Sequence, residues 1–127
     1  MSVEQEAKKG VLVVEDDDEL RHLFTMMLEL EHFVVFEANA GEVGLSTLNQ
    51  NMGSIHVMIT DLGLPGIGGV DLITQARAAK PAIKIIGTSG FGSQNVRDMV
   101  LTAGADDFFA KPFSPMDIVQ RVKEFTK

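Results

Sequence analysis

The sequence predicts an α/β fold in which helices cover both faces of a parallel β-sheet. The first observation is a set of short apolar runs, which are typical of strands buried on both faces. These runs cover residues 11–14, 33–37, 55–60, 83–88 and 108–110. The second observation is that a segment with helical spacing of apolar residues follows each run. Because strand and helix alternate five times, right-handed crossovers give one doubly wound parallel sheet.

The helix expected after Asp18 has the clearest apolar face. We expect this face to contain Leu20, Leu23, Phe24, Met27 and Leu28. Two further helix starts are predicted near residues 40 and 115. Their signals are Asn39 followed by Glu42, and the stretch Ser114-Pro115-Met116-Asp117. The remaining apolar faces are formed by Ile73, Ala76, Val96, Val100, Ala103, Ile118, Val122 and Phe125.

Length and composition favour one domain and exclude several classes of protein. The chain has 127 residues, no cysteine and a net charge of −7. A disulfide scaffold and a cysteine zinc site are therefore excluded, and an acidic chain is poorly suited to direct nucleic-acid binding. We find no signal peptide and no membrane span, so we expect a cytoplasmic protein. Residues 1–9 are expected to be a flexible extension, and residues 10–127 the domain.

Two carboxylates follow the first predicted strand. Glu15 and Asp16 come directly after residues 11–14, at the sheet edge where open α/β folds bind ligands. Acids at this position are also typical of a solvated loop before a helix, and Asp17 and Asp18 fit that interpretation. Mg²⁺ prefers carboxylate and water oxygens in an octahedral shell. We therefore expect Glu15 and Asp16 to contribute to a magnesium site.

A third carboxylate, Asp61, follows residues 55–60 and precedes a turn-rich loop. Taken alone, an aspartate here is also typical of a turn. Beside Glu15 and Asp16, however, it completes a cluster of like charges whose repulsion a divalent cation relieves. A carboxylate can also act as a nucleophile toward a phosphoryl group. Asp61 is therefore the candidate phosphoacceptor.

Polar residues also follow the last two predicted strands. Lys111 ends the fifth apolar run, and its ammonium group there would offset carboxylate charge and bind a phosphoryl oxygen. Ser89 ends the fourth run and offers a hydroxyl, while Gly90 lets a phosphoryl group approach its backbone N–H. Each residue alone is equally typical of an exposed loop or turn. The Lys111-Pro112 peptide is a candidate for the cis isomer.

Together these motifs make the chain resemble the receiver domain of two-component response regulators, from about Val11 to Phe125. The resemblance rests on Glu15-Asp16 in VLVVEDD, Asp61 in ITDLGLPG, Ser89, and Lys111-Pro112. It implies a flavodoxin-like (βα)5 domain with strand order 2-1-3-4-5. It also implies that Asp61 takes a phosphoryl group, with Mg²⁺, from a histidine kinase or a phosphotransfer protein. Slow hydrolysis would then return Asp61 to its free form.

The resemblance also implies how the metal is held and how the signal leaves the site. The implied Mg²⁺ ligands are Glu15, Asp16, Asp61 and the backbone carbonyl of Gly63. Ser89 and Phe108 match a switch pair, in which the hydroxyl moves toward the phosphoryl group and the aromatic ring turns toward the core. The changed surface would then bind a downstream effector protein or domain.

Two positions depart from the pattern of receiver domains. Phe108 stands where the family commonly has Tyr, so its ring has no hydroxyl to form a hydrogen bond. The loop after Asp61 is rich in glycine, and Gly68 stands where receivers frequently carry Asp. These departures concern the switch and the loop after Asp61.

Three other classes of protein are compatible with parts of the pattern. A flavodoxin-type cofactor protein shares the fold, but the acids at 15–19 would repel the phosphate of FMN. A phosphatase of the haloacid dehalogenase type needs a second acid two residues after the nucleophile, where this chain has Gly63. The alternative that stays open is a receiver-fold interaction module that works without phosphorylation.

Overall fold

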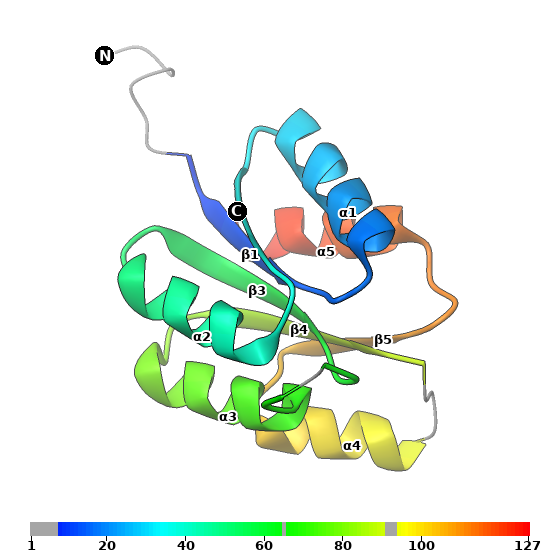
Figure 1. Cartoon of the computed structure of the whole chain (residues 1–127). Coiled ribbons are helices and arrows are strands. Elements are labelled where there is room, and N and C mark those ends of the chain that lie inside the picture. The colour runs from blue at the N-terminus through cyan, green and yellow to red at the C-terminus, as the bar shows by residue number, and fades with distance from the viewer. Residues whose placement is uncertain (1–7, 65, 91–93) are drawn as a thin grey trace.

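The computed structural model describes residues 8–64, 66–90 and 94–127 (Figure 1). The expected flexible extension falls largely on residues 1–7, which lie outside the described residues. The first strand begins at Gly10, which is where the sequence places the start of the domain. Among the described helices, none has the length and apolar character that crossing a bilayer requires.

Five strands and five helices alternate along the chain (Figure 1). The strands are β1 (Gly10–Val14), β2 (Val34–Ala38), β3 (Ile55–Asp61), β4 (Lys84–Ser89) and β5 (Asp107–Ala110). The helices are α1 (Asp18–Leu30), α2 (Gly41–Gln50), α3 (Gly69–Ala79), α4 (Gln94–Ala103) and α5 (Pro115–Phe125). The strands form one parallel sheet in the order β2-β1-β3-β4-β5, so the expected fold and strand order are confirmed.

The sheet separates two layers of helices. Helices α1 and α5 cover one face, and α2, α3 and α4 cover the other (Figure 1). Successive residues of β1 alternate between the two cores: Val11 and Val13 pack with α1 and α5, whereas Leu12 and Val14 pack on the opposite side. Because both faces are buried, the strands contain continuous apolar runs rather than alternating polar residues. This alternation also decides which strand-end side chains share the functional site.

Helix α1 confirms most of its predicted face and corrects one member of it. The side chain of Asp17 caps the helix by accepting hydrogen bonds from the N–H groups of Glu19 and Leu20. Phe24 and Leu28 are fully buried, but Leu23 is 42% exposed. One residue corresponds to about 100° around a helix axis, so adjacent positions cannot both point straight at the sheet. Arg21, at the same helical spacing as Phe24 and Leu28, takes the buried position instead.

The two predicted helix starts are found within one residue of their expected positions, with different capping. Helix α2 begins after Ala40, and the carboxylate of Glu42 accepts a hydrogen bond of 2.6 Å from the N–H of Ile67 instead of closing a capping box. Helix α5 begins at Pro115 after Ser114, whose hydroxyl makes no capping hydrogen bond. Thus the sequence predicts where these helices start, whereas tertiary contacts decide the partners of the capping groups.

We expect Phe24→Ala to lower the free energy of unfolding by about 3–5 kcal/mol, because it leaves a cavity between α1 and the sheet. Leu23→Ala is the matched control on the same helix turn, and its half-exposed side chain should cost less than about 1 kcal/mol. Urea unfolding of both variants measures the difference. Equal losses would contradict the assignment of Leu23 to the surface.

Candidate functional site

Three strand ends bring the predicted acidic residues and the lysine together. Glu15 follows β1, Asp61 ends β3, and Lys111 follows β5. Because these strands are parallel, their carboxyl ends meet at one edge of the sheet. Glu15 is 3% exposed and Asp61 is 7% exposed, so both carboxylates lie in a buried setting beside solvent-exposed Asp16. The predicted cluster of residues therefore forms in the folded chain.

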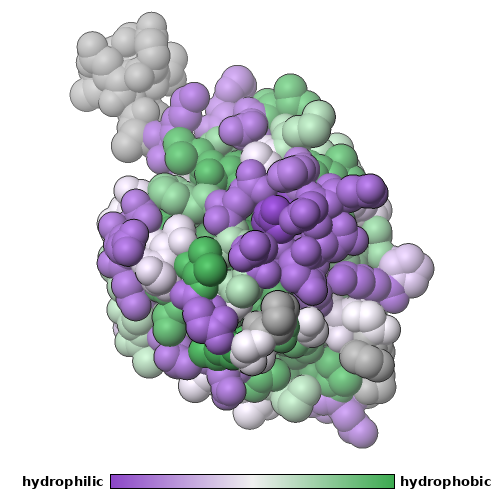
Figure 2. Space-filling view, in the orientation of Figure 1, coloured by the Kyte–Doolittle hydropathy of each residue, from purple (hydrophilic) through white to green (hydrophobic). Residues whose placement is uncertain are grey.

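The three carboxylates are arranged as a potential cation site. Glu15, Asp16 and Asp61 each present a carboxylate oxygen, and these oxygens all lie within 4.8 Å of one another. The donor set contains only oxygen, and Asp16 opens it to water, as suits an ion that keeps several water ligands. The residues present therefore fit a Mg²⁺ ion. Hydrophilic side chains also gather on the surface near the start of α1 (Figure 2).

The ammonium group of Lys111 contacts two of the carboxylates. Its Nζ lies 3.4 Å from Oδ2 of Asp61 and 3.7 Å from Oε1 of Glu15. The backbone N–H of Lys111 donates to the carbonyl of Ser89, which fixes the chain at the end of β5 against β4. The Lys111-Pro112 peptide is cis, as the sequence suggests. Lys111 thus has the geometry expected of a group that offsets charge at Asp61.

The pKa of Glu15 is raised to about 7, chiefly because burial disfavours its charged form. The N–H of Asp17 donates to its Oε2 at 3.1 Å and opposes this shift, while the nearby charge of Asp61 adds to it. A carboxyl with this pKa is protonated in part at neutral pH. A cation bound between Glu15 and Asp61 would favour the ionised form.

Two glycines named by the sequence analysis flank the site. The backbone N–H of Gly63 donates to Oδ1 of Asp61 at 3.3 Å, which brings the start of the next loop against the carboxylate. A Cβ placed on Gly90 would meet no described atom within 4 Å, so the packing around it does not require a glycine. The expected approach of a phosphoryl group to its N–H stays a prediction, as does the metal contact of the Gly63 carbonyl.

The register of the sheet places the two hydroxyl residues at the end of β4 on opposite faces, and the expected role of Ser89 stays a prediction. Asp61 of β3 pairs with Thr88 of β4, and Ser89 pairs with Ala110 of β5. Side chains of paired residues in a parallel sheet point to the same face, and neighbours along a strand alternate. Thr88 therefore shares the face of Asp61, whereas Ser89 shares that of Phe108. Both hydroxyl residues end the same apolar run, and a shift of one residue along the strand separates them.

Phe108 already lies in the core. Its ring is 6% exposed and packs in the cluster that contains Val100 of α4. The cross-strand partner of Phe108 is Gly87, whose lack of a side chain makes room for Val100, since a Cβ there would lie 2.7 Å from Cγ1 of Val100. The sequence analysis expects the ring to turn inward after phosphorylation. The structure places Phe108 in the core, and the expected movement of the ring stays a prediction.

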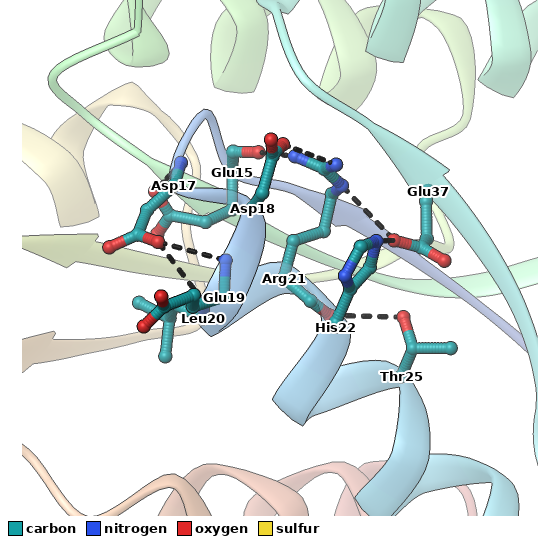
Figure 3. Close-up of polar contacts among 9 residues, drawn as sticks. All are labelled: Glu15, Asp17, Asp18, Glu19, Leu20, Arg21, His22, Thr25 and Glu37. Atoms are coloured by element: carbon teal, nitrogen blue, oxygen red, sulfur yellow. Dashed lines mark hydrogen bonds and ion pairs between the residues drawn. The ribbon is translucent and has the colours of Figure 1, made fainter.

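Sequence reasoning missed Arg21, which lies beside Glu15, Asp18 and Glu37 (Figure 3). Its guanidinium donates to the carbonyl of Glu15 and to the carboxylates of Asp18 and Glu37. The signal was present in the helical spacing, because Arg21 is three residues before Phe24 on the face that packs against the sheet. A basic residue on an otherwise apolar stripe indicates a buried partner network.

Glu15 should make stability depend on pH when divalent cations are removed. Its folded pKa of about 7 exceeds the ordinary value of 4.5, so the stabilisation is complete below pH 4.5 and is lost as pH rises to about 7. The loss is on the order of 3 kcal/mol. Glu15→Gln removes the titration and should flatten this dependence. Urea unfolding in EDTA between pH 4.5 and 8 tests it, and equal slopes for both proteins would contradict the assignment.

Comparison with known proteins gives a consistent result. A family model described as the response regulator receiver domain matches residues 11–123. The transcriptional regulatory protein SrrA of Staphylococcus aureus is 35% identical over 113 residues, which are 89% of this chain and 46% of SrrA. The chain thus spans about half the length of the curated relatives it matches.

Solved structures show the same similarity in three dimensions. A response regulator from Chloroflexus aurantiacus is 30% identical with a TM-score of 0.84, and the match covers 93% of this chain and 97% of that one. The BeF3-activated receiver domain of DrrB is 26% identical with a TM-score of 0.84, covering 94% and 97%. With the fold, the acidic cluster and the family match over residues 11–123, this chain belongs to the response regulator receiver domain family.

Proposed function

We propose that Asp61 accepts a phosphoryl group from the phosphohistidine of a histidine kinase or a phosphotransfer protein. The observation that carries this proposal is the setting of Asp61, which lies between the carboxylates of Glu15 and Asp16 and the ammonium group of Lys111. A turn-forming aspartate requires none of these neighbours. For a nucleophilic carboxylate in phosphoryl transfer, a cation site and a basic side chain both stabilise the charge of the transferring group.

In the proposed reaction, an oxygen of Asp61 bonds to phosphorus as the bond between phosphorus and the donor's imidazole nitrogen breaks. The leaving imidazole keeps the electron pair of that bond. Glu15, Asp16 and Asp61 would hold Mg²⁺, together with the Gly63 carbonyl that the family resemblance implies. When bound, this ion offsets charge on the phosphoryl oxygens. Lys111 binds one of those oxygens and loses its direct contact with the Asp61 carboxylate.

The phosphoryl group also needs a hydroxyl partner, and we propose Ser89 for this role. Ser89 is the last residue of β4, and its carbonyl accepts a hydrogen bond from the N–H of Lys111, so it lies beside the residue whose ammonium group contacts Asp61. Water that attacks phosphorus later cleaves the acyl phosphate and restores Asp61. Receipt and loss of the group then form a reversible signal, which the surface of the domain transmits to an effector.

The partners follow from the reaction and from the relatives. SrrA is named a transcriptional regulatory protein and extends well beyond the matched segment. We propose that this chain acts on a downstream effector protein or domain and that any contact with DNA is made outside residues 11–123. The net charge of −7 supports this division, because an acidic surface is repelled by phosphates. A cytoplasmic location fits a kinase partner and is part of the proposal.

Asp61→Asn should abolish labelling by acetyl phosphate with Mg²⁺, because an amide is not a nucleophile toward phosphorus. In the wild type the label should be an acyl phosphate, which base and hydroxylamine remove. Mass spectrometry of the labelled chain locates the group. A label on Thr60, Thr88 or Ser89 would overturn the chemistry. No label on any residue would instead favour an interaction module that works without phosphorylation.

Thr88→Ala and Ser89→Ala separate the two candidate hydroxyls. We expect Ser89→Ala to reduce affinity for beryllofluoride by about tenfold or more, because it removes one hydrogen bond to a charged group. Thr88→Ala should have a smaller effect, since Thr88 lies one residue before the end of β4. Fluorine NMR titration measures both affinities. A larger loss for Thr88→Ala would contradict the assignment of Ser89.

A further inference from the structure

Arg21 connects three parts of the chain around one guanidinium (Figure 3). Its side chain is 10% exposed. Nη1 donates to the carbonyl of Glu15 at 2.8 Å, Nη2 to Oδ1 of Asp18 at 2.7 Å, and Nε to Oε1 of Glu37 at 3.0 Å. These acceptors belong to the end of β1, the first turn of α1 and the end of β2. Arg21 therefore ties the turn between β1 and α1 to the neighbouring strand.

The turn that Arg21 fixes is the one that carries two of the three clustered carboxylates. The peptide groups at Glu15 are bonded on both sides: its N–H donates to the carbonyl of Ala38 at 3.0 Å, and its own carbonyl accepts from Arg21. The N–H of Asp17 in turn donates to the Glu15 side chain. The directions in which the Glu15 and Asp16 side chains leave the backbone are thus set by a network that includes Arg21.

We propose that Arg21 is a positioning residue for the cation site. Its guanidinium donates to the backbone carbonyl of Glu15 rather than to the Glu15 carboxylate. It thereby holds the backbone at Glu15 so that the carboxylates of Glu15 and Asp16 face Asp61. This inference rests on the proposed function, because it concerns the same cation site. Helix α1 then has a second role besides packing against the sheet, because it carries the residue that positions the cation ligands.

The geometry requires an arginine rather than a positive charge alone. The three acceptors lie on separate elements, and the planar guanidinium offers its donors in a fixed fork. The ammonium of lysine is a compact charge whose donors radiate from one nitrogen. Arg21→Lys would keep the charge near Glu37 and Asp18 but leave the Glu15 carbonyl without its fixed donor. If Arg21 only balances charge, Mg²⁺ affinity should be unchanged in Arg21→Lys. If Arg21 positions the backbone at Glu15, Mg²⁺ affinity should fall.

Arg77 provides a matched control at the opposite edge of the sheet. Its guanidinium likewise bonds backbone carbonyls, those of Pro81, Ile83 and Gly104, and one carboxylate, that of Asp106. These groups precede β4 and β5, whereas the cation site follows β1 and β3. Arg77→Lys therefore disturbs a similar network and leaves the turn at Glu15 intact.

The test compares Mg²⁺ affinity in the wild type, Arg21→Lys and Arg77→Lys by titration calorimetry, with thermal melting of each metal-free protein. We expect Arg21→Lys to weaken Mg²⁺ binding by about tenfold or more, the usual range for residues that orient metal ligands. Arg77→Lys should lower the melting temperature without changing Mg²⁺ affinity. Labelling of Asp61 by acetyl phosphate in Arg21→Lys should recover as Mg²⁺ is raised, because the nucleophile itself is intact.

Wild-type affinity in Arg21→Lys, or an equal loss in Arg77→Lys, would overturn the inference. If Arg21→Lys does not fold, Glu37→Gln supplies the test, since it weakens one anchor of the guanidinium at a half-buried position. Glu37→Gln should then reduce Mg²⁺ affinity while Arg77→Lys does not, and unchanged affinity would overturn the inference. A wild type that binds no Mg²⁺ would overturn the proposed function, and with it the role of Arg21.

Discussion

Repulsion among three carboxylates at one edge of the sheet is the constraint on which the site depends. Their oxygens lie within 4.8 Å of one another, and a pair of unit charges at that distance repels by about 3 kcal/mol at an effective dielectric of about 20. Lys111 offsets part of this repulsion, and the raised pKa of Glu15 relieves more of it by keeping a proton. The remaining repulsion is what makes the site responsive to a divalent cation.

The sheet keeps the charged residues in place despite that repulsion. The central strands β1, β3 and β4 are buried on both faces and β5 pairs with β4, so the positions at which β1, β3 and β5 end are set by the packing of two helix layers. Arg21 of α1 further restrains the end of β1, because it donates hydrogen bonds to the carbonyl of Glu15 and to the carboxylate of Glu37 in β2. Packing in the two cores thus offsets the unfavourable free energy of placing like charges close together at the edge of the sheet.

The sequence predicts the parallel sheet and the acidic cluster because these depend on strand ends, whereas the strand order comes from the resemblance to receiver domains. Apolar runs mark where a parallel strand stops, and the next polar residue then lies at the binding edge, as Glu15 and Asp61 do. The register adds that Thr88 and Ser89 are on opposite faces of the sheet, which the apolar run does not determine. Leu23 and Arg21 differ in burial because of the rotation of α1 against the sheet. That rotation follows from packing, which sequence periodicity gives only approximately.

Phe108 changes how phosphorylation is coupled to the surface of the domain. A tyrosine at this position has a hydroxyl that favours contact with water or a polar partner, whereas a phenylalanine ring gains about 1.5–3 kcal/mol by burial alone. Phe108 is 6% exposed and packs in the core that contains Val100 of α4. A complete switch from about 1:99 to 99:1 needs roughly 5.5 kcal/mol of differential stabilisation. In the proposed function, this stabilisation comes from contacts of the phosphoryl group with Lys111 and Ser89 and from packing of the ring, because Phe108 has no hydroxyl to form a hydrogen bond.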